Sequence, residues 1–314
     1  MTSPTDNQES NRVKAIALLG QWLQQRIDAE QYDWLTAQLD KSLKSNSGKD
    51  LFITLGMIPR KLSRLDLDLT KDELAQAEAT RPGWDPSQWS IAGSARIFVA
   101  AQLAENELAV NSDGFGKQYQ ELCRTADVSE SIELYSALPL LPQSPELDSQ
   151  VGEGLRTNMR AVFESIAHRN PYPRETFDEN RWNHMVLKAL FVDSTLAPIQ
   201  GLDDRANDQL AGILCDYAHE RWAANRPVTC ELWRCVGPFA TGERLQDLQR
   251  VLKEADVNAQ RAAAIALSQS PETKAAEILS AHSELDEAVR SGNIVWQGEN
   301  PVPSEVSLSL KAGA

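Results

Sequence analysis

Apolar residues recur at intervals of three and four along almost the whole chain, and runs that alternate apolar and polar residues are nearly absent. Between residues 13 and 27, Val13, Ile16, Leu19, Leu23 and Ile27 share one helical stripe. A second stripe follows between residues 32 and 43. This periodicity is typical of amphipathic helices, and it predicts an all-α protein.

Helix starts can also be predicted from local chemistry. The segment Thr70–Glu73 has the form of a capping box, in which the hydroxyl accepts from the third helical amide and the glutamate reaches back. The segment Asp85–Gln88 offers a cap, a proline and a glutamine, and it predicts the start of a long helix. The segment Ser270–Glu272 predicts a later start in the same way.

Faint internal repetition suggests how the helices are arranged. Residues 256–267 are rich in alanine and resemble the inner helix of a HEAT-type repeat, because small residues let neighbouring helices approach closely. Residues 155–166 and 131–141 have a similar rhythm. We therefore expect stacked helix pairs, a HEAT-like or α-solenoid architecture, with an irregular helical bundle as the alternative.

Composition shifts suggest the domain organisation. The polar, proline-bearing stretch 142–151 predicts a boundary between an N-terminal helical region, residues 11–142, and a C-terminal helical region, residues 143–298. The polar residues 1–10 predict a flexible N-terminus. The proline-bearing residues 299–314 lack an apolar stripe and predict a flexible tail.

Charge and cysteine usage narrow the class of function. The chain of 314 residues has a net charge of −14, which disfavours nucleic-acid partners. No stretch reaches the ~20 apolar residues of a membrane span, so we expect a cytoplasmic protein that does not span a membrane. The cysteines contain no CxxC pair and predict buried free thiols in a reducing compartment; they are Cys123, Cys215, Cys230 and Cys235.

No catalytic motif emerges from the residues. Cys215 and His219 lie four apart on one predicted helix, a spacing that can present two metal ligands, but zinc requires three or four. The four histidines form no HExxH motif, and a packed or capping histidine is the favoured interpretation. GxSxG and GxGxxG elements are absent from the sequence. We expect no metal, no cofactor and no catalytic set.

The segment 181–239 concentrates the unusual residues. In the turn 201–207, Arg205 lies where a helix begins and, with Lys188, could hold a carboxylate or phosphate between Trp182 and Trp222. The alternative is that Asp203 or Asp204 pairs with Arg205 and fixes the loop. The candidate ligand-binding residues are Trp182, Asn183, Lys188, Asp204, Arg205, Asn207, His219, Glu220, Trp222 and Arg226.

A second ambiguity concerns two carboxylates one turn apart. Asp216 and Glu220 share a helix face and could line a ligand site or hold a cation. The preferred interpretation is an ion-pair network that joins helices through nearby arginines, namely Arg205, Arg221, Arg226 and Arg234.

The same segment resembles the EboA family of metabolite-traffic proteins. The matching residues are Trp182-Asn183, Leu187–Phe191, Gly201–Asp203, Arg205–Asn207, Asp216–Ala224, Arg226 and Leu232–Arg234. The resemblance implies a component of a bacterial gene cluster that makes a specialised metabolite, including precursors of an indolic sunscreen pigment, or moves it towards the periplasm. The neighbouring genes of such clusters resemble those of a prenyltransferase, a sugar-phosphate-type cyclase and metal-dependent hydrolases. The family has no established reaction of its own.

The resemblance therefore implies an accessory protein that scaffolds the cluster's enzymes or holds a metabolite precursor. Its expected partners are an anionic or indolic small molecule and enzymes of the same cluster. The alternative is an enzyme that acts on the intermediate, with His219, Glu220 and Arg205 lining a helical pocket. A helical adaptor with an exposed apolar groove is a third possibility.

Overall fold

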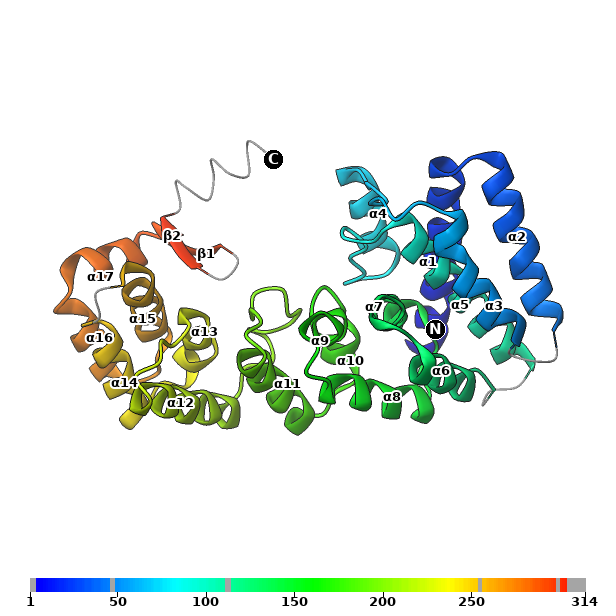
Figure 1. The fold of residues 1–314 in the computed structure, drawn as a ribbon. Helices are drawn as coiled ribbons and strands as arrows, with labels where there is room; N and C mark the ends of the chain where they lie inside the picture. Colours follow the sequence, from blue (N-terminus) through cyan, green and yellow to red (C-terminus); the bar gives the residue numbers. More distant parts are fainter. Residues whose placement is uncertain (1–3, 46–48, 111–113, 254–255, 298–299, 304–314) are drawn as a thin grey trace. The chain divides into compact units, whose positions relative to one another are not determined.

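The computed structural model describes residues 4–45, 49–110, 114–253, 256–297 and 300–303. Over these residues the protein is all-α, as the periodicity predicted, with a single two-stranded antiparallel hairpin near the C-terminal end (Figure 1). Of the predicted flexible ends, residues 1–3 and 304–314 lie outside the described residues. Helix α1 begins at Pro4, and strand β2 covers Asn300–Pro303.

The chain divides into two compact units, residues 1–176 and 177–314. Unit 1 therefore continues past the predicted boundary at residue 142, because Leu147 and Val151 are buried where helix α8 packs on α6 and α9. The helices of unit 1 are α1 (Pro4–Arg26), α2 (Ala29–Lys44), α3 (Lys49–Lys61), α4 (Lys71–Thr80), α5 (Ile91–Val110), α6 (Gly114–Thr125), α7 (Val128–Ser136), η1 (Leu138–Leu140), α8 (Pro145–Arg156), α9 (Arg160–Ala167) and α10 (Tyr172–Thr176).

Helix α5 is the centre of unit 1. It packs against α1, α2, α3, α6 and α7, and most of its described side chains are buried all round the helix. Its sequence is accordingly apolar on every face rather than on one stripe. Small residues such as Ala95 and Ala101 allow its neighbours to approach closely.

Local capping chemistry sets one predicted helix start and fails at another. The capping box of α4 is present: Glu73 N donates to Thr70 Oγ1 at 3.2 Å, and Thr70 N donates to Glu73 Oε2 at 2.8 Å. The predicted start at Asp85 is wrong, because α5 begins only at Ile91. The amide of Ile91 donates to Leu65 O at 2.9 Å, and this pairing with residues 65–67 keeps the preceding segment out of the helix.

Unit 2 is built around the alanine-rich helix α15. It packs against α13, α14, α16, α17 and β2. Small residues let these neighbours approach, as residues 256–267 predicted; the HEAT-like stacking itself stays a prediction. The elements of unit 2 are α11 (Glu179–Phe191), α12 (Asp208–Ala223), η2 (Cys230–Leu232), α13 (Trp233–Val236), η3 (Gly237–Phe239), α14 (Glu243–Val251), α15 (Val257–Gln269), α16 (Thr273–Ser280), α17 (Ser283–Arg290), β1 (Ile294–Gln297) and β2.

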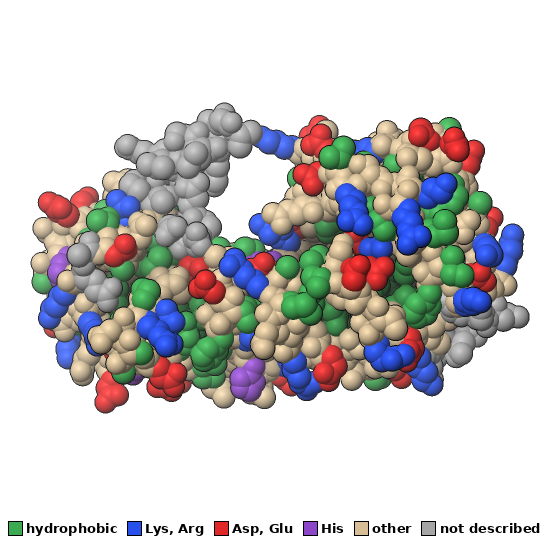
Figure 2. Space-filling view, viewed as in Figure 1, with side chains coloured by type: hydrophobic (Ala, Val, Ile, Leu, Met, Phe, Trp, Pro, Cys, Tyr) green, Lys and Arg blue, Asp and Glu red, His purple; other side chains and the backbone are tan. Residues whose placement is uncertain are grey.

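The surface and the thiols complete the description. Acidic and basic side chains are interspersed with apolar ones on the face shown in Figure 2. Within the described ranges, no helix is long and apolar enough to cross a membrane. The four cysteines are free thiols; Cys215 and Cys235 are buried, whereas Cys123 and Cys230 are half-buried.

Candidate functional site

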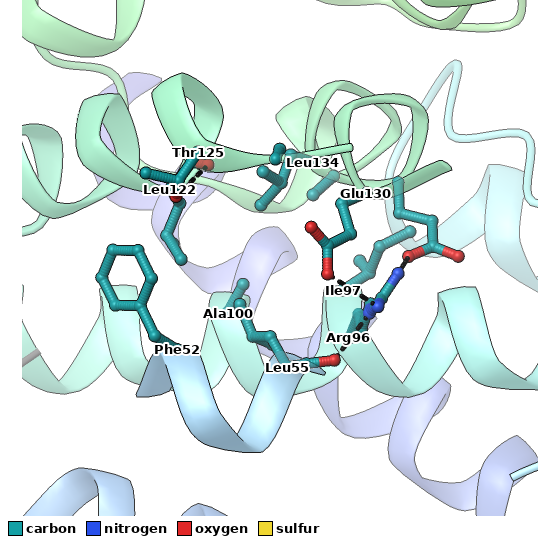
Figure 3. Close-up of a pocket in the computed structure, with 12 residues that line it drawn as sticks. Phe52, Leu55, Arg96, Ile97, Ala100, Leu122, Thr125, Glu130 and Leu134 are labelled. Atoms are coloured by element: carbon teal, nitrogen blue, oxygen red, sulfur yellow. Dashed lines mark hydrogen bonds and ion pairs between the residues drawn. The ribbon is translucent and has the colours of Figure 1, made fainter. Parts of the chain in front are cut away.

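A pocket of about 150 Å³ opens in unit 1 between helices α3, α5, α6 and α7 (Figure 3). Its walls are mostly aliphatic or aromatic, and its charged groups gather at one end around a single arginine, Arg96. We call this site the Arg96 pocket. Its lining residues are Phe52, Leu55, Arg96, Ile97, Ala100, Leu122, Thr125, Ala126, Glu130, Glu133, Leu134 and Ala137.

Arg96 is buried within an otherwise apolar helix, with 7% of the residue exposed. Its Nε donates to Leu55 O at 2.8 Å on α3. On α7, its two terminal nitrogens donate to Glu133 Oε2 at 2.5 Å and to Glu130 Oε1 at 2.9 Å. A buried guanidinium is tolerated only when it is paired in this way, so these contacts tie α3, α5 and α7 together.

A helix cap places the two carboxylates on the face of α7 that meets α5. Asp127 Oδ1 accepts from Glu130 N at 2.8 Å, and Glu130 Oε2 accepts from Asp127 N at 3.1 Å. The Glu130 carboxylate is therefore shared between the cap and Arg96. Glu133 follows three residues later, on the same face of the helix. Its space depends on Gly93, where an added Cβ would lie 3.3 Å from the Glu133 side chain.

The polar end of the pocket carries more negative than positive charge. Two carboxylates face one guanidinium, and no other ionisable side chain lines the pocket. Burial raises the pKa of the Glu133 carboxyl, and the hydrogen bond and charge of Arg96 offset this rise only in part. The site thus contains a carboxylate whose negative charge is incompletely compensated.

The predicted ligand-binding residues lie in unit 2 and form separate groups. In the first group, the Arg205 guanidinium lies over the Trp182 ring, 4.6 Å from its centroid, and donates to Phe177 O at 2.8 Å. Asn183 and Asn207 form a reciprocal pair of amide hydrogen bonds, at 3.1 and 2.9 Å. Asn207 also caps α12 by accepting from Leu210 N at 2.8 Å.

The alternative that Asp203 or Asp204 pairs with Arg205 and fixes the turn differs from the contacts observed. Asp203 instead makes a two-fold salt bridge with Arg234, with both contacts at 2.5 Å. Arg205 reaches the carbonyl of Phe177 and the face of Trp182, which lies on α11. Asp204 is exposed.

A second group lies between α12 and α14. His219 Nε2 contacts Asp247 Oδ1 at 2.7 Å, and Cys215 lies against the same carboxylate. Trp222 stacks on Trp233 with ring centroids 5.9 Å apart. The Arg250 guanidinium lies over the Trp222 ring, 4.1 Å from its centroid. His219 thus contacts a carboxylate across the two helices, and the described residues contain no group of three or more potential metal ligands.

The remaining predicted residues are dispersed. Glu220 and Arg226 line a small surface pocket with Phe191 and Tyr217, whose rings meet edge to face at 5.3 Å. Within the described ranges, neither Asp216 nor Glu220 forms an ion pair. The predicted arginine network around them is therefore not observed there. Burial lowers the pKa of Lys188 on α11.

Sequence reasoning did not single out Arg96, Glu130 and Glu133. One signal was available: an arginine stands in the middle of the otherwise uncharged stretch Ile91–Leu103, and a charge in a buried helix requires a partner. The spacing of Asp127 and Glu130 was a second signal, since it has the form of a capping box. Neither signal reveals which helices meet.

Comparison with known proteins gives one result. Residues 15–237 match a protein family described as "Metabolite traffic protein EboA", over more than two-thirds of the chain. No curated protein and no solved structure matches the chain. The matched span extends well beyond residues 181–239, and it includes every residue that lines the Arg96 pocket.

Proposed function

The chain belongs to the EboA family of metabolite traffic proteins, and we propose that the Arg96 pocket is where it holds its small-molecule metabolite. The observation that supports this proposal is an apolar pocket with a buried arginine and two carboxylates at one end. Binding sites for small molecules have this construction, because apolar walls supply affinity and a few fixed polar groups supply orientation.

The size of the pocket limits what enters it. A cavity of about 150 Å³ lined by aliphatic and aromatic side chains accommodates a ligand as large as benzene. The Arg96 pocket has a similar volume. A single ring or a short branched chain of the metabolite therefore fits inside, while the rest of a larger molecule extends through the mouth.

We propose that the protein holds this molecule rather than converting it. The side chains that line the pocket include no histidine or cysteine, and the hydroxyl of Thr125 donates to Glu121 O at 3.0 Å within its own helix. Arg96 is engaged by two carboxylates and a carbonyl. These features favour holding over catalysis, and we propose an accessory protein of a metabolite gene cluster that acts in the cytoplasm and passes a precursor to enzymes of the cluster.

The test combines native mass spectrometry with a variant that fills the pocket. Protein purified from its own host is expected to carry a reproducible additional mass that disappears on denaturation. Ala100→Leu should abolish this mass, because the larger side chain occupies the pocket next to Ile97. Ala79→Leu is the matched control, since Ala79 is exposed on α4 in the same unit.

Three outcomes separate the proposal from its rivals. Loss of the mass in Ala100→Leu alone supports the Arg96 pocket. Loss in Arg226→Ala, with retention in Ala100→Leu, would move the site to the surface pocket of unit 2, where Glu220 and Arg226 were predicted to bind. A retained mass that changes to a different product on incubation would favour the enzyme alternative.

A further inference from the structure

We infer that the Arg96 pocket selects a ligand that carries a protonated amine on an apolar, ring-sized group, and that it discriminates against carboxylates and phosphates. The inference rests on the proposed function, since it assumes that this pocket is the ligand site. It differs from the expectation of an anionic metabolite, which depended on Arg205 and Lys188 in unit 2.

Three of the five N–H groups of the guanidinium at the polar end are already used. Each of the three guanidinium nitrogens of Arg96 donates to an oxygen of the protein: Leu55 O, Glu133 Oε2 and Glu130 Oε1. Each terminal nitrogen of Arg96 is paired with a carboxylate, so an anionic ligand that approached the guanidinium would be repelled by Glu130 and Glu133 or would displace one of them. Either outcome opposes binding, because like charges repel and a partly buried carboxylate that loses its partner is unfavourable.

The hydrogen-bond acceptors are in excess. Both oxygens of Glu130 accept a hydrogen bond, one from Arg96 and one from the amide of Asp127. Glu133 uses Oε2 for Arg96, whereas its Oε1 has no hydrogen bond to any part of the chain that the structure describes. A carboxylate can accept several hydrogen bonds, so Glu133 offers a further acceptor at the polar end of the pocket.

The charge balance points to the same ligand class. The lining contains two carboxylates and one guanidinium, which leaves one negative charge when all three are ionised. Figure 3 shows Glu130 beside Arg96, with Phe52 and Leu122 further along the pocket. An ammonium group at the polar end would supply the missing positive charge, while its ring packs on the apolar walls. The net charge of −14 of the whole chain also attracts cations.

Three probes of equal size separate charge from shape. Benzylamine, benzyl alcohol and benzoate each present one aromatic ring with a cationic, neutral or anionic group. By titration calorimetry of the full-length protein at pH 7, benzylamine should bind at least about tenfold more tightly than benzyl alcohol, and benzoate should bind most weakly. Ala100→Leu should abolish binding of all three.

Glu133→Gln tests the group that makes the selection. This variant removes the uncompensated charge and keeps the shape, so benzylamine should lose its about tenfold advantage while benzyl alcohol binds as before. Glu121→Gln is the control, because Glu121 pairs with Arg124 on the exposed side of α6 and does not line the pocket. If circular dichroism shows that Glu133→Gln is unfolded, Glu130→Gln replaces it, since glutamine also serves in a capping box.

The failure of this inference can be told from the failure of the proposed function. Binding that Ala100→Leu abolishes, but that favours benzoate or treats all three probes alike, would retain the pocket and refute its selectivity for amines. An unchanged preference in folded Glu133→Gln and Glu130→Gln would refute the role of these carboxylates. Absence of binding by every probe, together with a host-derived mass that survives in Ala100→Leu, would overturn both proposals.

Discussion

The close approach of η3 to helix α15 provides a sharp test of the packing in unit 2. At Gly237, an added Cβ would lie 2.8 Å from Ala266 Cα and 3.0 Å from Ala266 O. Both atoms belong to the backbone of α15, so neither can move by a simple change of rotamer. Carbon atoms in ordinary contact are about 3.5–4.0 Å apart. Gly237→Ala therefore requires the two segments to separate by about 0.7 Å or more.

The expected cost follows from this geometry. Inserting a methyl group into a well-packed interior costs about 1–3 kcal/mol. Gly237 has a φ of −46°, which alanine adopts without strain, and replacing glycine in helical backbone returns about 0.5–1 kcal/mol. The net destabilisation should be about 1–2 kcal/mol. For a unit of this size, this corresponds to a Tm lower by about 3–8 °C.

The chain offers a matched control for this substitution. Gly56 lies within α3, is exposed, and has no atom within 4 Å of the position of an added Cβ. Gly56→Ala should therefore raise stability by about 0.5–1 kcal/mol. The assay is thermal unfolding followed by circular dichroism at 222 nm. A Gly237→Ala protein that melts at or above the wild-type temperature, while Gly56→Ala behaves as expected, would refute the close approach.

Three further predictions concern carboxylates and thiols. Burial raises the pKa of Glu73, but hydrogen bonds from Arg26 and Thr70 outweigh this effect and leave the pKa below its ordinary value. Glu73→Gln should therefore lower the Tm at pH 7. The difference in Tm from the wild type should shrink as the pH falls below 4.5, in thermal melts at several pH values. Glu231→Ala removes the acceptor of Leu196 N and Ala197 N, both at 2.8 Å. It should lower the free energy of unfolding in urea by about 2–4 kcal/mol. A change below about 1 kcal/mol would contradict the anchoring of this loop. Burial raises the pKa of three thiols, those of Cys123, Cys215 and Cys235, to about 12. Iodoacetamide at pH 8 should therefore modify them only after denaturation, as measured by mass spectrometry.

Much of the helical structure could be predicted because its signals are local. The apolar stripe that starts at Val13 lies within α1 except for its last residue, Ile27, and the capping box at Thr70–Glu73 begins α4. Both patterns involve residues three or four positions apart. The family was also predictable, because the segment 181–239 carries a distinctive combination of residues along one stretch of chain.

The tertiary structure decided what the side chains do. Arg96 meets Glu133, 37 positions away, and Asp203 meets Arg234 rather than its near neighbour Arg205. Helix α5 begins later than its capping residues indicate because residues 65–67 pair with the segment before it. Each of these outcomes depends on which helices pack together. A capping pattern encodes contacts within one turn, whereas a pocket between four helices exists only after burial of their apolar faces has brought distant residues into contact.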